Sequence, residues 1–183
     1  MRLPRPWTSP KTPEAAVNID IRPVSRAEAE AWRALRLEML KRHPTAFMSS
    51  YEAWRDRDLD AFAAQIPDDG VDVLFGAFVG EVLCGSAAFA REARAKLAHK
   101  GWMEKVYVAP ALRGRGVGEA LVRTVIDQAR RHVETLLCGV GSDNIAAGRL
   151  YRRMGFVAYG TEPRALRYAG RDYDEDLLVL TLY

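Results

Sequence analysis

Residues Met103 to Arg131 read MEKVYVAPALRGRGVGEALVRTVIDQARR, and the rest of the chain is organised around them. The Val-Tyr-Val segment at 106–108 favours a β-strand. Pro110 ends that strand, because proline lacks the N–H donor that a sheet ladder needs. From Val117 onward, apolar residues recur at helical spacing. The sequence therefore predicts a buried strand, a short loop rich in glycine and arginine, and a helix.

The loop between this strand and this helix has the composition of an anion-binding turn. A helix start presents N–H groups without partners and a partial positive charge, and glycines let the backbone approach a ligand closely. Arg113 and Arg115 add guanidinium groups whose geometry suits phosphate oxygens. A solvated turn without a ligand is the alternative. The loop lacks the Lys-Ser/Thr pair of a P-loop and the glycine spacing of a dinucleotide fingerprint.

The composition predicts one soluble domain. The chain has 183 residues, of which 49% are hydrophobic, and a net charge of +3. This charge suits an anionic ligand but is too small to indicate nucleic acid binding. No apolar run reaches the roughly 18 residues of a membrane span. Cys84 and Cys138 lack the spacing of a metal site or a disulfide framework. We expect a flexible arm at 1–17, a single domain at 18–183, no metal, no membrane contact and a cytoplasmic location.

The remaining segments predict an α/β fold with a mixed central sheet flanked by helices. We expect the first helix at 27–44 to begin with a capping box made by Ser25 and Glu28. The residues at 91–100 read as a surface connection and those at 161–176 as a charged loop or hairpin. The other expected elements are strands at 18–24, 71–79, 82–91, 136–140, 156–160 and 177–183, and helices at 51–66 and 144–154.

A second motif covers Asn144 to Phe156 and fits the pattern N-x-x-A-x-x-L-Y-x-x-x-G-F. If Asn144 caps a helix, Ala147 and Tyr151 follow at i+3 and i+7 and lie on one helix face. That face would present an amide, a small residue and a phenol. The alternative is that Tyr151 is a core aromatic residue with its hydroxyl at the surface.

The two motifs together resemble those of the GNAT superfamily of N-acetyltransferases. Arg113 to Gly118 fits R-x-x-G-x-G after a V-Y-V-A-P strand, and the second motif follows about 30 residues later. The resemblance covers about residues 19–183. It implies the GNAT-like acyl-CoA N-acyltransferase fold and acetyl-CoA as the cofactor. It also implies direct transfer of the acetyl group, in a ternary complex, to a primary amine of a small molecule or peptide.

The resemblance also implies roles for individual residues. The 106–108 backbone would pair with the pantetheine arm, an N–H near Val108 would stabilise the oxyanion, and the loop amides would hold the pyrophosphate. Tyr151 would protonate the departing thiolate. The implied cofactor-binding residues are Val106, Tyr107, Val108, Arg113, Gly114, Arg115, Gly116, Val117, Gly118, Asn144, Ala147 and Tyr151.

The general base is open at this stage. Glu104 precedes the 106–108 strand core and matches an acidic residue common there in the superfamily, but a strand glutamate paired with a lysine or arginine is the alternative. Some family members carry the base on the fifth strand, at the position of Gly139, which has no side chain to serve. Glu104, His99 or a chain of water molecules are the candidates.

The acceptor site and the partners are also expectations. We expect the acceptor amine between the first two helices, the 91–100 connection and the 161–176 segment, whose acidic residues would attract a cation. A solvated charged hairpin is the alternative for that last segment. Edge strands make a homodimer compatible with the fold. An acyl-CoA-sensing module without turnover is the competing function. A nucleic-acid binder would rest only on the basic balance and on Arg152 and Arg153.

Overall fold

The computed structural model describes residues 18–182, so the predicted arm at 1–17 lies outside the described residues. A seven-stranded sheet runs through this part of the chain in the order β1-β2-β3-β4-β5-β7-β6. All neighbouring strands are antiparallel except β4 and β5, which are parallel. The strands are β1 Asp20–Pro23, β2 Val73–Val79, β3 Val82–Arg91, β4 Lys100–Val108, β5 Thr135–Gly141, β6 Val157–Tyr168 and β7 Arg171–Thr181.

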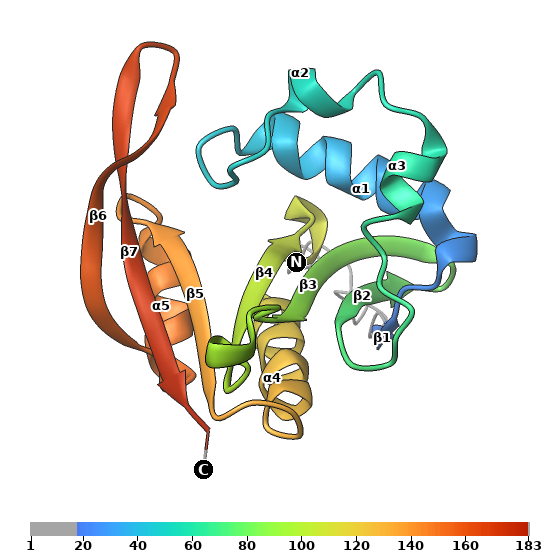
Figure 1. Ribbon diagram of the computed structural model, residues 1–183. Helices are drawn as coiled ribbons and strands as arrows, with labels where there is room; N and C mark the ends of the chain where they lie inside the picture. The colour runs from blue at the N-terminus through green and yellow to red at the C-terminus, as the bar shows by residue number, and fades with distance from the viewer. Residues whose placement is uncertain (1–17, 183) are drawn as a thin grey trace, which may run out of the picture.

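Helices cover both faces of this sheet (Figure 1). Alternate residues of β2 belong to two different cores: Leu74 and Phe78 pack with α1 and α3, whereas Phe75 and Ala77 pack with α4. Side chains of a strand alternate between the two faces, so these two cores lie on opposite sides of the sheet. The helices are α1 Ala29–Arg42, α2 Tyr51–Trp54, α3 Leu59–Ala63, α4 Val117–Ala129 and α5 Ile145–Arg153.

The predicted mixed α/β sheet flanked by helices is confirmed, with corrections to single elements. The helix predicted at 51–66 is two short helices, because the side chain of Asp58 accepts a hydrogen bond from the Ala61 N–H and begins a new helix there. The segment at 161–176 is a hairpin in which β6 and β7 extend to a turn at Ala169 and Gly170. The predicted capping box of Ser25 and Glu28 is present, and it begins the short 3-10 helix η1 Arg26–Glu28, which leads into α1.

The central strand β4 is bent by a bulge. Ser86 of β3 is paired with Tyr107 and Ala88 with Glu104, so Lys105 and Val106 share the place opposite one residue of β3. Lys105 has φ 54°, and its carbonyl accepts a hydrogen bond from the Ser86 hydroxyl at 2.7 Å. A bulge re-aims a strand and interrupts its ladder. The end of β4 is thereby directed away from its parallel neighbour.

Strands β4 and β5 pair only at their beginnings. Their register runs from Lys100 and Thr135 to Trp102 and Leu137 and stops there, although both strands continue. Beyond these residues the two strands diverge (Figure 1). Backbone groups of 103–108 that point toward β5 consequently have no ladder partner on that strand. The α1–α2 connection and the tip of the β6–β7 hairpin lie at this open end of the sheet (Figure 1).

Candidate active site

The glycine loop forms an open cradle at the N-terminus of α4. Gly114 and Gly116 have φ 75° and 78°, and an added Cβ would meet nothing within 4 Å at either position. Within residues 18–182, no backbone carbonyl accepts from the N–H groups of Gly114, Gly116, Val117 or Gly118. Free N–H groups at the start of a helix lie at the positive end of its dipole and favour an anion. The loop therefore has donors that could hold an anionic group.

The side chain of Arg113 contacts the ends of β4 and α1. Its Nε donates to the carbonyl of Val108 at 3.0 Å, and its Nη2 lies 2.8 Å from Nε2 of His43, just beyond the end of α1. These contacts turn the guanidinium back toward the end of β4. Arg113 therefore joins the start of the loop to β4 and α1, and its role in cofactor binding stays a prediction.

The N–H group of Val108 points toward the gap between β4 and β5. Ala109 donates its N–H to the Cys84 carbonyl of β3 at 2.8 Å. Successive residues of a strand direct their N–H groups to opposite sides. The Val108 N–H is therefore directed away from β3. By the same alternation the backbone of Tyr107 faces β3.

The side chain of Tyr107 belongs to a contact between β4 and α1. It is 5% exposed, and its hydroxyl donates to Glu38 Oε1 at 2.9 Å. Burial and this hydrogen bond raise the pKa of Tyr107 to about 12. Arg42 pairs with the same carboxylate at 3.0 Å. The phenol of Tyr107 therefore stays protonated and holds α1 against the end of β4.

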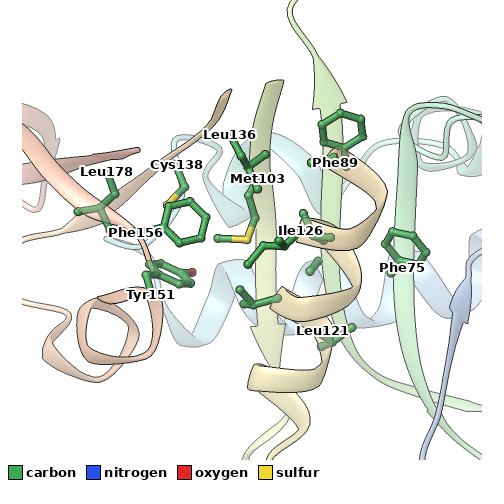
Figure 2. Close-up of a cluster of buried hydrophobic side chains, with 14 of the residues drawn as sticks. Phe75, Phe89, Met103, Leu121, Ile126, Leu136, Cys138, Tyr151, Phe156 and Leu178 are labelled. Atoms are coloured by element: carbon green, nitrogen blue, oxygen red, sulfur yellow. The ribbon is translucent and has the colours of Figure 1, made fainter. Parts of the chain in front are cut away.

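Helix α5 is built as its motif predicts. The side-chain oxygen of Asn144 accepts from the Ala147 N–H at 3.3 Å and caps the helix. Tyr151 lies one turn further along and is 6% exposed, with its ring centroid 5.9 Å from that of Phe156. Figure 2 shows its hydroxyl pointing from α5 toward the side on which β4 and α4 lie.

The environment of Tyr151 keeps its hydroxyl protonated. Burial, with a further contribution from Cys138, raises the pKa of Tyr151 well above its ordinary value. Within residues 18–182 the hydroxyl makes no hydrogen bond. A buried phenol usually finds a partner. Tyr151 is thus a buried, protonated phenol beside β5.

Glu104 and His99, the two side chains considered from the sequence as the general base, lie at different positions along β4. Glu104 is exposed on the α1 face, and its carboxylate pairs with Lys105 Nζ at 2.9 Å. His99 precedes the first residue of β4, and its carbonyl accepts from the N–H groups of Glu134 and Thr135. His99 therefore lies at the opposite end of β4 from Val108. The connection at 91–100 lies at that end too, so the structure does not bring it to the diverging strands.

One acidic residue of the 161–176 segment, Glu175 of β7, was not assigned individually as a site residue from the sequence. An added Cβ at Gly139 of β5 would lie 2.6 Å from both carboxylate oxygens of Glu175. The side chain of Glu175 therefore covers the face of Gly139. A glycine inside a strand often marks a close approach by another group, and this was the signal in the sequence. The partner could not be read from it, because the pairing of β5 with β7 was unknown.

A hollow on the described surface lies away from these residues. It has a volume of about 570 Å³ and is lined by residues of the β1 end, the α3–β2 connection and the second half of α4 with the turn that follows it, among them Val24, Asp68, Thr124 and Arg131. No predicted site residue lines it. The candidate site is therefore defined by backbone donors and diverging strands.

Comparison with known proteins identifies the family. Residues 30–156 match the model of the acetyltransferase (GNAT) family, and they cover most of the chain. The chain belongs to the acetyltransferase (GNAT) family. Its sheet, in which the parallel pair β4 and β5 diverges, and its covering helices are the fold of that family.

Solved GNAT structures resemble this chain over nearly their whole length. The yncA structure from Salmonella typhimurium, solved with its cofactor acetyl-CoA, has a TM-score of 0.80 and 25% identity and covers 91% of this chain and 95% of that one. The ribosomal-protein-alanine N-acetyltransferase from Brucella melitensis has a TM-score of 0.76 and 26% identity, with coverage of 88% and 99%.

Curated GNAT relatives match over a shorter region. The N-alpha-acetyltransferase RimI of Mycobacterium tuberculosis is 38% identical over 97 residues, which are 53% of this chain and 60% of that protein. The phosphinothricin N-acetyltransferase of Streptomyces coelicolor is 37% identical over 83 residues, 44% of this chain and 48% of that protein. The chain spans 60% or less of the length of these two relatives.

Proposed function

We propose that this GNAT protein is an acetyl-CoA-dependent N-acetyltransferase that acts on a primary amine in a ternary complex. The observation that carries the proposal is the cradle at the start of α4, where unpaired N–H groups and two open glycines meet beside diverging strands. The GNAT relatives named above act on amino groups. The competing function is an acyl-CoA sensor, which would need the cradle but not Tyr151.

The cofactor would be held by backbone groups from both motifs. The N–H groups of residues 114–118 would donate to the pyrophosphate, as helix N-termini commonly do. Val106 and Val108 would pair with the pantetheine arm as an added strand would. Asn144 would act through the helix start that it caps, and Ala147 would leave room for the arm beside α5. Acetyl-CoA supplies the acetyl group as a thioester.

The protein's own groups would stabilise the charges that develop during transfer. The Val108 N–H would donate to the carbonyl oxygen as it gains negative charge, an interaction worth about 3–4 kcal/mol in other acyl-transfer sites. Tyr151 would give its proton to the departing sulfur. A thiol has an ordinary pKa of about 8.5, so the thiolate is basic enough to accept a proton in the buried space beside Tyr151.

The acceptor would enter on the α1 face, at the end where the α1–α2 connection and the β6–β7 hairpin lie. Glu104 is exposed on this face and would meet the ammonium group of the acceptor as an electrostatic partner or as the base.

No helix within 18–182 is long and apolar enough to cross a membrane. A cytoplasmic location and a homodimer stay predictions.

Turnover with an amine panel tests the function. Thiol release from acetyl-CoA would be followed with L-methionine sulfoximine, phosphinothricin and a peptide with an N-terminal alanine, using wild type and Tyr151→Phe. Tyr159→Phe, at a tyrosine 55% exposed on β6, is the matched control. We expect turnover that falls at least tenfold in Tyr151→Phe only, with unchanged acetyl-CoA affinity. Binding of acetyl-CoA without turnover of any amine would favour the sensor.

A further inference from the structure

Gly139 and Glu175 form one unit across two strands. The register pairs Gly139 with Leu177 and Gly141 with Glu175, so Glu175 lies on β7 beside the last residue of β5, at the end that faces the open part of the sheet. An added Cβ at Gly139 would overlap the carboxylate, at 2.6 Å from each oxygen. The absence of a side chain at Gly139 is therefore what lets the Glu175 carboxylate lie on β5.

This carboxylate lies on the acceptor face. Cys138 and Val140 are buried in the core that contains α4 and α5, so Gly139 between them faces the opposite side, where α1 lies. Further along β5, an added Cβ at Gly141 would lie 3.9 Å from the Thr45 carbonyl of the α1–α2 connection. Glu175 is thus close to the segment expected to cover the acceptor.

The carboxylate also lies at the level where the sheet opens. The last paired residues of the parallel strands are Trp102 and Leu137. Two residues further, β4 carries Glu104 and β5 carries Gly139, both on the α1 face. The carboxylates of Glu104 and Glu175 therefore flank the divergence from opposite strands, with the Val108 N–H further along β4.

The two carboxylates differ in their partners. Glu104 is paired with Lys105 at 2.9 Å, whereas Glu175 makes no hydrogen bond or ion pair within residues 18–182. Glu175 is half-buried, and burial together with the charge of Glu162 raises its pKa above the ordinary value. A general base works best when its pKa is near the working pH. Of the two, Glu175 has the environment of a base.

We infer that Glu175 is the general base that takes a proton from the acceptor ammonium, with the carboxylate held in the space that Gly139 leaves open. The inference rests on the proposed function. One N–H proton passes to the carboxylate and then to solvent, and the freed lone pair forms the N–C bond. The C–S bond breaks, Tyr151 protonates the sulfur, and the second N–H proton restores its hydroxyl.

Four ionisable groups besides Glu104 lie near this carboxylate. Glu162 faces it from β6, where the two residues are paired, and Cys138 precedes Gly139 on β5. Asp174 and Asp176, its neighbours on β7, accept hydrogen bonds from the Arg164 N–H and from the Ser142 and Thr161 hydroxyls. Glu162 is therefore the charge that most directly sets the proton affinity of Glu175.

The test is the pH dependence of kcat/KM for Glu175→Gln, with Glu162→Gln and Glu104→Gln for comparison. General base catalysis contributes about 100-fold or more, so Glu175→Gln should lose that much at pH 7 and recover as rising pH deprotonates the free amine. Glu162→Gln should leave the maximal kcat/KM unchanged. The fall in kcat/KM on the acid side of the profile should move to lower pH, because this variant removes the charge that raises the pKa of Glu175. The acetyl-CoA affinity should be unchanged in both variants.

A double variant, Gly139→Glu with Glu175→Gly, separates the base role from folding. It returns a carboxylate to the same face from β5 and should regain at least tenfold over Glu175→Gln. A wild-type-like pH profile in Glu175→Gln, or an effect of this variant on the acceptor KM alone, would overturn the inference. Either result would leave the proposed transferase function intact. A loss in Glu104→Gln that pH restores would overturn it too. A wild type that releases no thiol with any amine would instead remove the proposed function.

Discussion

Arg113 and His43 join the start of the glycine loop to the end of α1, with Nη2 of Arg113 2.8 Å from Nε2 of His43. Arginine only donates, so His43 accepts through Nε2 and carries its proton on Nδ1, a tautomer assigned from this contact. Burial, Arg113 and Arg42 lower the pKa of His43. The neutral form that the contact requires is therefore the stable one near neutral pH.

Replacing Arg113 should weaken cofactor binding without unfolding the protein. Arg113→Ala removes both contacts that hold the loop, and hydrogen bonds from a charged group contribute about 1.5–3 kcal/mol. We expect the Kd for acetyl-CoA, measured by titration calorimetry, to rise at least tenfold. Arg123→Ala on the exposed side of α4, where the partner is Glu119, is the control and should leave the Kd unchanged. Equal Kd values for the two variants would refute a positioning role for Arg113.

Acid should disrupt the same contact. The pKa of His43 is lower in the folded protein than its ordinary 6.5, so the contact is intact above pH 6.5 and is lost as pH falls through the folded value. The acetyl-CoA Kd of wild type should therefore rise below pH 6.5, relative to that of His43→Gln, whose amide does not titrate. Parallel pH curves for the two proteins would show that His43 does not control the loop.

A methyl group in the cradle should abolish cofactor binding at a modest cost in stability. Gly116 has φ 78° and Gly170, in the β6–β7 turn, has φ 76°. A Cβ added at either position would meet no other atom within 4 Å. Alanine at either position costs about 1–2 kcal/mol because of the left-handed backbone. We expect Gly116→Ala and Gly170→Ala to lower Tm similarly, but only Gly116→Ala to lose acetyl-CoA affinity. Loss of affinity in both would mean that backbone strain is responsible.

Local sequence signals predicted most of the fold. Ser25 with Glu28, Asn144 and the spacing of apolar residues from Val117 each act within a few residues, so the elements that they define agree with the structure. The split between α2 and α3 was missed because Asp58 was not identified as an N-cap. The bulge at Lys105 left no local signal, because it depends on how β4 pairs with β3.

The candidate site also has some features that local sequence predicts and others that it does not. The open glycines and the helix cap were predictable, since they depend on backbone conformation near one position. The contact of Arg113 with His43 and the placement of Glu175 over Gly139 join residues 70 and 36 positions apart in the chain. Such pairs are fixed by the packing of α1 on the sheet and by the register of β5 with β7. Neither feature follows from one sequence alone.

The capping box should account for part of the acid sensitivity. Arg22 and the Ser25 N–H hold the pKa of Glu28 at about 2, below its ordinary 4.5. A lowered carboxyl pKa contributes stability that is present above pH 4.5 and is lost as pH falls toward 2. We expect Glu28→Gln to reduce the free energy of unfolding by about 1 kcal/mol at pH 7. This difference should shrink between pH 4.5 and 2, and a constant difference would contradict the assignment.

We expect the buried side chain of Arg36 to destabilise the folded protein. It is 5% exposed, its Nε has no hydrogen-bond partner, and burial lowers its pKa to about 10. Its other contacts are weak: Nη1 lies 3.8 Å from Met39 Sδ, and the guanidinium lies 5.6 Å from the Phe47 ring. Apolar side chains of similar volume often stabilise positions of poorly paired buried charge. Arg36→Met should leave Tm unchanged or raise it, whereas exposed Arg153→Met should have no effect. A clear fall in Tm for Arg36→Met alone would show that these contacts stabilise the fold.

The most direct test of the central claim is a crystal structure of the protein with coenzyme A. The account predicts the diphosphate on the N–H groups of residues 114–118 and the pantetheine arm along Val106 and Val108, between β4 and β5. Its sulfur should lie within reach of the Tyr151 hydroxyl. A diphosphate bound elsewhere, or a gap between these strands closed by side chains in the complex, would contradict the account.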